Sequence, residues 1–205
     1  LDRGYNIYSL SRYDGFDVTN KETIKKFFLS HPEYKNVETL IYLPAGRGYS
    51  YALKDKIRDI TVDGLENVLK ETENIPILFV SSASTGLENY EFTNPYTLAK
   101  KEAELLLKNS NKDYVIVNPT ECWGKGMRGA KIKLIKNLAD GILKYVNVNG
   151  STNIVDVSDC SNAVVDIIDN WEIYRYKNVL IAGQEIRYKE LFDYVRNSLG
   201  INNRI

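Results

Sequence analysis

The chain has 205 residues, which is enough to bury a substantial core as one domain or as one large domain with a small appendage. Hydrophobic residues make up 43% of the chain and charged residues 26%, both ordinary values for a globular protein. Because 27 Lys and Arg residues balance 27 Asp and Glu residues, the charge gives no reason to expect nucleic acid or an anionic membrane as the main partner.

The apolar runs are too short to cross a bilayer, and the N-terminus lacks a secretory signal pattern, so we expect a cytoplasmic protein. Two cysteines, Cys122 and Cys160, and a single histidine, His31, are too few for a disulfide scaffold or a common zinc site, so no metal site is predicted. The chain opens on Leu1 rather than Met, which favours a fragment, a processed product or the ordered part of a longer protein.

Strand and helix patterns alternate along the chain. Strands are expected at residues 5–12, 37–46, 75–84, 113–124 (running into a loop) and 178–183. Helices are expected at residues 20–30, 56–73, 95–110, 130–145, 157–171 and 187–200. The run at 37–46 is nearly continuous in apolar residues, which is typical of a strand covered on both faces. The alternation predicts βαβ units and an α/β fold with a doubly wound parallel sheet.

Ligands of such sheets bind beyond the carboxyl ends of the strands. The residues expected at that edge are Ser11 and Arg12, Pro44 to Gly46, Ser81 to Ser84, and Asn118 to Trp123. They bring hydroxyl, guanidinium, amide and thiol groups to one edge, which makes it the expected position of a site.

Tyr96 and Lys100 stand four residues apart at the start of the helix expected at 95–110. Residues with this spacing are neighbours on a helix, so the Lys100 ammonium can lie close to the Tyr96 phenol. A nearby positive charge favours the phenolate and lowers a pKa that starts near 10, as acid or base chemistry near neutral pH requires. The spacing alone is weak evidence in a chain with 15 Tyr residues, and two solvated residues on a helix face are the simpler interpretation.

A cluster of hydroxyls ends the strand before this helix, in the sequence FVSSAS at residues 79–84. A serine hydroxyl there can hold a substrate oxygen while Tyr96 moves the proton. The alternative is a strand-end turn whose serines satisfy their own backbone.

Several segments, taken in order, resemble the extended short-chain dehydrogenase/reductase family, which includes nucleotide-sugar epimerases and dehydratases. They are SLSRYDGFDVTN (9–20), TLIYLPAG (39–46), ITVDGLENVLKE (60–71), FVSSAS (79–84), NPYTLAKKEAE (94–104), VIVNPTECWGKG (115–126) and IVDVSDCSNAVVDII (154–168). The resemblance covers nearly the whole chain. It implies a Rossmann-like fold and an NAD(P)-dependent epimerase, dehydratase or reductase acting on a nucleotide sugar or a similar small molecule.

The resemblance also implies roles for single residues. Tyr96 would be the catalytic acid/base, Lys100 would tune it and bind the nicotinamide ribose, and Ser82 would hold the reacting oxygen. Ser81 and Ser84 are the alternatives to Ser82. Arg12 stands where an acidic residue would bind the ribose of NAD and suits a 2′-phosphate instead, so NADP is favoured over NAD.

Further residues fall where the family contacts its ligands. Besides Arg12, Tyr96 and Lys100, cofactor contacts are implied for Asp17, Val18, Leu43, Pro44, Ala45, Asn118, Pro119 and Thr120. Substrate contacts are implied for Ser84, Cys122 and Trp123, although a buried thiol and a packing indole are simpler roles for the last two.

The family's glycine fingerprint, which cradles the cofactor pyrophosphate, is absent from the sequence, and neither GRG at 46–48 nor GKG at 124–126 replaces it. The implied organisation is a nucleotide-binding domain at 1–124, a substrate-region segment at 125–150, and a return to the sheet followed by the start of a C-terminal substrate region at 151–205. A homodimer is implied as well. The alternative is a non-catalytic scaffold or redox-sensing protein that keeps the fold and binds a dinucleotide.

Overall fold

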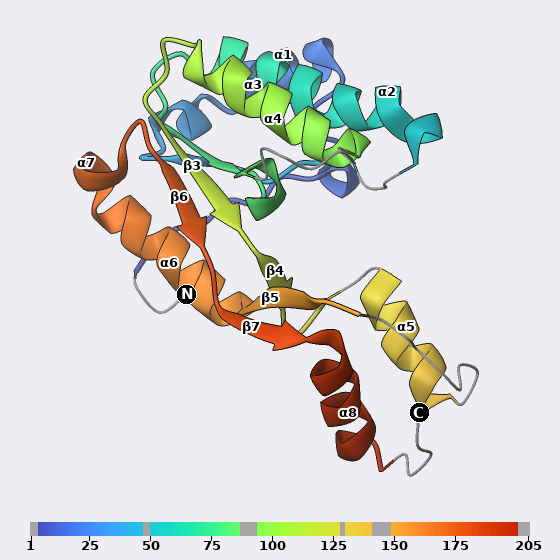
Figure 1. Ribbon diagram of the computed structural model, residues 1–205. Helices are drawn as coiled ribbons and strands as arrows, with labels where there is room; N and C mark the ends of the chain where they lie inside the picture. Colours follow the sequence, from blue (N-terminus) through green and yellow to red (C-terminus); the bar gives the residue numbers. More distant parts are fainter. Residues whose placement is uncertain (1–3, 47–49, 87–93, 128–129, 141–148, 201–205) are drawn as a thin grey trace. The chain divides into compact units, whose positions relative to one another are not determined.

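The computed structural model describes residues 4–46, 50–86, 94–127, 130–140 and 149–200 (Figure 1). The chain divides into two compact units. Unit 1 is Leu1–Val117 with Trp171–Val179, and unit 2 is Asn118–Asn170 with Leu180–Ile205. The three-part division expected from the sequence stays a prediction.

The main sheet is formed by β1 (Leu40–Tyr42), β2 (Ile77–Val80), β3 (Tyr114–Pro119) and β6 (Asn178–Ile181), in the order β1-β2-β3-β6. β1 pairs with β2, and β2 with β3, in parallel registers. β2 and β3 are almost entirely buried, which is why their continuous apolar runs were recognisable in the sequence. The predicted α/β fold with a parallel, Rossmann-like sheet is confirmed.

Four helices of unit 1 lie together over the same face of this sheet (Figure 1). They are α1 (Lys21–Ser30), α2 (Lys54–Arg58), α3 (Gly64–Glu71) and α4 (Pro95–Lys108), and the short α7 (Trp171–Tyr174) precedes β6. Their apolar faces meet the strands in one core, which includes Ile24, Phe28, Leu65, Val68, Leu107, Ile77, Phe79 and Ile116. Among the described residues, no helix is both long and apolar enough to cross a membrane.

The helix expected at 56–73 is interrupted by a π-helical stretch, Asp59–Asp63, between α2 and α3. Groups of this stretch bind β1 and the segment that follows it. Ile60 O accepts a hydrogen bond from Tyr42 Oη at 3.0 Å, and Thr61 Oγ1 accepts one from Gly46 N at 3.0 Å. Burial raises the pKa of Tyr42 far above its usual value, so the phenol remains a donor. The stretch therefore anchors β1 and the segment that follows it.

Residues 5–12 do not form the expected strand. They have no regular secondary structure until the 3-10 helix Arg12–Asp14, and Ile7 and Tyr8 are exposed. Strand composition is not enough, because a strand is stabilised by its neighbours in a sheet. In the described part of the chain, β1 is an edge strand that pairs with β2 alone.

The expectation that residues 37–46 form a strand covered on both faces is also wrong. The strand is limited to Leu40–Tyr42, and although Tyr42 is buried, Ile41 is 42% exposed and Leu43 is 65% exposed. A nearly continuous apolar run predicts a central strand, whereas β1 lies at the edge of the sheet order among the described strands. One side of β1 therefore presents apolar surface.

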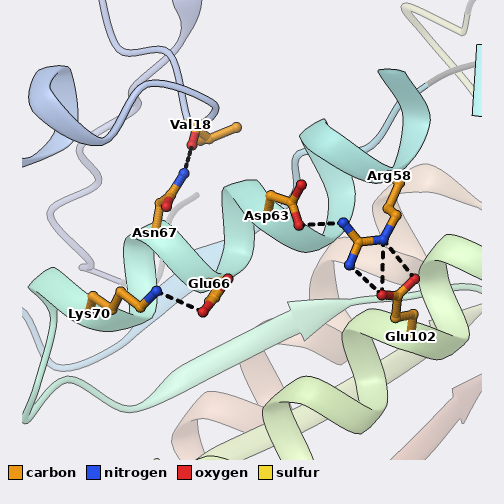
Figure 2. A network of polar contacts seen from close by, with 7 residues as sticks. All are labelled: Val18, Arg58, Asp63, Glu66, Asn67, Lys70 and Glu102. Atoms are coloured by element: carbon orange, nitrogen blue, oxygen red, sulfur yellow. Dashed lines mark hydrogen bonds and ion pairs between the residues drawn. The ribbon is translucent and has the colours of Figure 1, made fainter. Parts of the chain in front are cut away.

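Polar contacts tie the segments of unit 1 to one another (Figure 2). Asn67 Nδ2 on α3 donates to Val18 O at 3.1 Å and is buried, so it holds the N-terminal segment against the helix. Arg58 on α2 donates from Nη2 to Glu102 Oε1 on α4 at 2.6 Å and from Nη1 to Asp63 Oδ1 at 2.7 Å. The ion pairs of Arg58 are partly exposed and contribute little to stability, but they fix α2 beside α4.

Unit 2 contains a second sheet that the sequence analysis missed. It consists of β4 (Glu121–Trp123), β5 (Ser151–Asp156) and β7 (Gln184–Arg187), with β4 parallel to β5 and β5 antiparallel to β7. β4 lies within the strand expected at 113–124, which the structure divides into β3 and β4. β5 and β7 are short and largely polar, so neither length nor alternation marked them. The helices are α5 (Ala130–Ala139), α6 (Val157–Asp169) and α8 (Tyr188–Ser198), and the part of the expected helix at 141–145 lies outside the described residues.

Candidate active site

Helix α4 begins at Pro95, as the sequence predicted, and the structure adds Asn94 as its cap. Asn94 Oδ1 caps the helix by accepting a hydrogen bond from Thr97 N at 3.0 Å. Pro95 takes the first helical position, where its fixed φ suits a helix and its missing N–H breaks no bond. These residues set the register of α4, which places Tyr96 in the first turn, half-buried, and Lys100 one turn later.

Lys100 is a buried lysine that is bound to the end of β2. It is 1% exposed, and its Nζ donates to Val80 O at 2.6 Å. The same Nζ lies 4.7 Å from the centre of the Phe79 ring. Burial lowers the pKa of Lys100 to about 8, and the negative charge of Glu104 opposes this effect. Because this pKa is close to neutral pH, Lys100 can gain or lose its proton there.

The end of β2 continues into a hydroxyl-rich turn, Ser81–Thr85. Ser82 Oγ and Ser84 Oγ are 3.0 Å apart. Thr97 Oγ1, in the first turn of α4, donates to Ser84 Oγ at 3.1 Å. The turn also satisfies its own backbone, because Thr85 N donates to Ser82 O at 3.1 Å. The structure thus brings the predicted Ser82 and Ser84 together against the helical turn that bears Tyr96.

The predicted cofactor segment Leu43–Ala45 follows β1. Tyr42 of β1 lies beside Phe79 of β2 in the register, so the two strands end side by side. Gly46 fixes the path of the segment, because a Cβ at this position would lie 2.3 Å from Ile57 Cα. Only glycine permits this approach to α2 without a backbone shift.

Arg12, Asp17 and Val18 form a second group in unit 1. Arg12 Nε lies 3.8 Å from Asp17 Oδ2, and 55% of the Arg12 side chain is exposed. Hydrogen bonds from the backbone N–H and the hydroxyl of Thr19 lower the pKa of Asp17, which keeps it charged beside Arg12. Val18 is buried. The Arg12 guanidinium is therefore loosely held and accessible to an anionic partner.

The predicted residues Asn118–Trp123 belong to unit 2. Asn118 and Pro119 end β3, and Thr120 N donates to Ile181 O at 2.9 Å. The buried atoms Thr120 Oγ1 and Trp123 Nε1 have no hydrogen-bond partner within the described part of the chain. Such atoms are rare in folded proteins because leaving them unsatisfied is costly, so they are groups that a polar ligand could complete.

The two cysteines form a thiol pair in unit 2. Cys122 donates a hydrogen bond to Cys160, which lowers the pKa of Cys160 to about 7 and raises that of Cys122. The sequence suggests only a substrate contact or a buried thiol for Cys122. The pairing of the two thiols depends on β4 and α6 coming together, which no sequence signal predicts.

Three residues of unit 1 escaped the sequence analysis: Thr61, Thr97 and Glu104. Thr61 holds Gly46 and Thr97 holds Ser84, and both contacts depend on tertiary packing. Glu104 accepts hydrogen bonds from hydroxyls of the serine turn. A signal for Glu104 was present, since an acid four residues after Lys100 lies on the same helical face.

The described residues fit part of a dinucleotide. In unit 1, Arg12 offers a guanidinium suited to a phosphate, and Lys100 offers an ammonium suited to a hydroxyl. A glycine-rich turn between a strand and a helix, which would bind a pyrophosphate, does not occur in the described ranges.

No protein-family profile matches the sequence, and no curated protein matches it. Solved structures do match. RMD from Pseudomonas aeruginosa, solved with NADPH, has a TM-score of 0.78 at 16% identity, over 93% of this chain and 74% of its own. A UDP-glucose 4-epimerase from Thermotoga maritima, solved with UDP-glucose, has a TM-score of 0.74 at 15% identity, over 99% of this chain and 74% of its own.

WbmG from Bordetella bronchiseptica, solved with NAD and UDP, has a TM-score of 0.73 at 17% identity, over 90% of this chain and 62% of its own. The chain thus spans between 62% and 74% of the length of these three neighbours. At such identities the likeness concerns the fold. This chain has the Rossmann-like fold of the extended short-chain dehydrogenase/reductase family, which its sequence motifs resemble.

Proposed function

We propose that this protein is an NAD(P)-dependent enzyme that transfers a hydride between nicotinamide and a hydroxyl- or carbonyl-bearing carbon of a nucleotide sugar or a similar small molecule. One observation carries the proposal. A buried lysine, Lys100, is bound to the end of β2, and the hydroxyls of Ser82 and Ser84 lie against the helical turn that bears Tyr96. Solved neighbours with this fold include a UDP-glucose 4-epimerase and proteins crystallised with NADPH or with NAD and UDP.

Proton transfer is assigned to Tyr96. Its phenol would give a proton to the substrate oxygen or take one from it, while Ser82 Oγ holds and orients that oxygen. The Lys100 ammonium, one turn along α4, favours the phenolate, and its burial strengthens the effect because the surroundings are of low dielectric. The hydride chemistry is supplied by the nicotinamide when it is bound.

Arg12 leads us to favour NADP over NAD. An exposed guanidinium can bind a 2′-phosphate through two parallel hydrogen bonds, and Asp17 at 3.8 Å can orient it. The other proposed cofactor contacts are Asp17, Val18, Leu43, Pro44, Ala45, Tyr96, Lys100, Asn118, Pro119 and Thr120. The proposed substrate contacts are Ser84, Cys122 and Trp123.

Replacement of Tyr96 by Phe tests the mechanism. The protein is incubated with NAD or NADP and a panel of UDP- and dTDP-hexoses, and the products are separated by chromatography. Tyr96→Phe should lower turnover by about 10²- to 10⁴-fold, because it removes the proton but keeps the ring. Tyr13→Phe is the matched control, since Tyr13 is fully exposed, and it should retain full turnover. Full turnover in Tyr96→Phe would exclude the proposed role.

A dinucleotide-binding scaffold or redox sensor is the second candidate, favoured by the lack of a glycine-rich pyrophosphate turn in the described residues. Thermal melting separates the candidates, because a ligand that binds the native state raises the melting temperature. NADP should raise it more than NAD, and Arg12→Ala should remove the difference. Binding without turnover on any sugar nucleotide favours the scaffold, and no shift with either dinucleotide contradicts both candidates.

The homodimer and the cytoplasmic location also stay predictions. Sedimentation velocity of the purified protein tests the first of them, and a single species of monomer mass at micromolar concentration would contradict it.

A further inference from the structure

Glu104 is a buried acid on α4, one helical turn after Lys100, and it is 7% exposed. Among the described residues, Ser81, Thr85 and Asn178 donate hydrogen bonds to its carboxylate. Ser81 Oγ lies 2.5 Å and Thr85 Oγ1 2.8 Å from Oε1, and Asn178 Nδ2 lies 3.1 Å from Oε2. The donors come from the end of β2, from the turn after it and from the start of β6. One carboxylate therefore joins three segments of unit 1.

The carboxylate holds both ends of the turn that carries Ser82 and Ser84. A carboxylate accepts hydrogen bonds and donates none, so the hydroxyl of Ser81 is fixed as a donor toward Glu104. Thr85 Oγ1 lies 2.8 Å from Ser82 O as well, which links the carboxylate to the backbone of the turn. Loss of the carboxylate would release both hydroxyls and loosen the turn.

The same carboxylate acts on the charge of Lys100. Burial lowers the pKa of Lys100, and the negative charge of Glu104 raises it, so Glu104 offsets part of the cost of burying the ammonium. Two other charged groups lie nearby, and one of them, Lys108, forms a long ion pair with Glu104 itself. Glu102 pairs with Arg58 of α2, and Lys108 lies 4.0 Å from Glu104 in a partly exposed position.

We propose that Glu104 is a positioning residue, which fixes the Ser81–Thr85 turn against α4 and keeps Lys100 charged for the proton transfer assigned to Tyr96. This inference rests on the proposed function, but its two physical claims concern the turn and the lysine and can be measured without turnover.

Glu104→Gln is the principal test, because it keeps the size of the side chain and one acceptor but removes the charge. Lysine labelled with 13C at Cε allows the titration of Lys100 to be followed by NMR. The midpoint should fall from about 8 by about one pH unit or more. Glu102→Gln is the matched control on the same helix, since its carboxylate binds Arg58 instead, and it should leave the midpoint unchanged. An unchanged midpoint in Glu104→Gln would overturn the inference.

Hydrogen exchange tests the turn. The Thr85 amide, which donates to Ser82 O, should exchange at least about tenfold faster in Glu104→Gln and at the wild-type rate in Glu102→Gln. If Glu104→Gln fails to fold, Glu104→Asp keeps the charge with a shorter reach. It should hold the Lys100 midpoint near the wild-type value and still speed the exchange of Thr85, and a wild-type exchange rate would overturn the positioning role.

Activity then separates this inference from the proposed function. If Tyr96→Phe abolishes turnover, Glu104→Gln should lower it by about 10- to 100-fold and should move the basic limb of the pH profile to lower pH. If Tyr96→Phe retains turnover, the proposed function fails, whereas the NMR and exchange results still decide the role of Glu104 in the fold. Glu104→Gln with a wild-type pH profile and full turnover overturns the inference while leaving the proposed function intact.

Discussion

The two units differ in how the buried polar groups of the predicted site residues and their partners are satisfied. In unit 1 the carboxylate of Glu104 is saturated by hydroxyl and amide donors, and the ammonium of Lys100 is bound to a backbone carbonyl. In unit 2 the buried atoms Thr120 Oγ1 and Trp123 Nε1 lack hydrogen-bond partners within the described residues. Unit 1 therefore holds its groups in fixed positions before any ligand arrives, whereas unit 2 has binding capacity that a ligand can fill.

Removal of a core ring from each unit should show the largest difference between them. Phe79→Ala should cost about 3–5 kcal/mol of unfolding free energy, because Phe79 lies fully buried in the core of unit 1 and also contacts Lys100 Nζ. Phe192→Ala in unit 2 should cost less, because α8 is mostly exposed and can relax around the cavity. Urea unfolding followed by tryptophan fluorescence measures both. Equal losses of unfolding free energy in the two variants would contradict a difference in rigidity between the two units.

A methyl group placed where the backbone is most crowded should have a smaller effect. Gly46→Ala should cost about 1–3 kcal/mol, because the new Cβ would lie 2.3 Å from Ile57 Cα in unit 1. Gly183→Ala is the counterpart in unit 2, where the Cβ would lie 2.1 Å from Ile154 O. Amide exchange should rise around β1 in the first variant and around β5 in the second.

Gly86→Ala is the control for both, because a Cβ there meets nothing within 4 Å. Its melting temperature should equal that of the wild type. A loss of protection in both units from either crowded variant would show that the units unfold together.

The smallest effect concerns the thiol pair of unit 2. At pH 7 iodoacetamide should alkylate Cys160 faster than an ordinary cysteine, because its pKa is about 7. Cys122→Ala removes the hydrogen bond that lowers this pKa, so alkylation should slow by a few-fold. Peptide mass spectrometry at timed intervals gives the rate, and an unchanged rate in Cys122→Ala would show that the pair does not set the reactivity. The chain has only these two cysteines, so unit 1 contributes no signal.

The sequence was sufficient where structure follows from local pattern. The buried runs of β2 and β3 and the start of α4 were predicted, because continuous apolar residues, a capping Asn94 and Pro95 specify them locally. The serine turn and the Tyr96/Lys100 spacing were also found in this way. Their catalytic roles came from the resemblance, and they stay predictions.

The sequence was insufficient where structure depends on partners distant in the chain. Residues 5–12 have strand composition but no sheet neighbour among the described residues. The exposure of Ile41 and Leu43 reflects the place of β1 in the strand order. The π-helical stretch leaves the apolar spacing of the helix unchanged, so no pattern marks it. The spacing from Lys100 places Glu104 on the same helical face, but the donors that bind its carboxylate come from three other segments, which no local pattern identifies.

The parallel pairing of β1, β2 and β3 also has a consequence for how unit 1 folds. Leu40 meets Ile77 and Ile77 meets Tyr114, so each pair of strands forms only after a crossover that contains helices has closed. No hairpin in this part of the sheet offers a local start, and contacts between distant residues make folding slow. β2 takes part in both pairings, so we expect it to belong to the folding nucleus. Substitutions in β2 should slow folding, whereas those in the edge strand β1 should mainly speed unfolding.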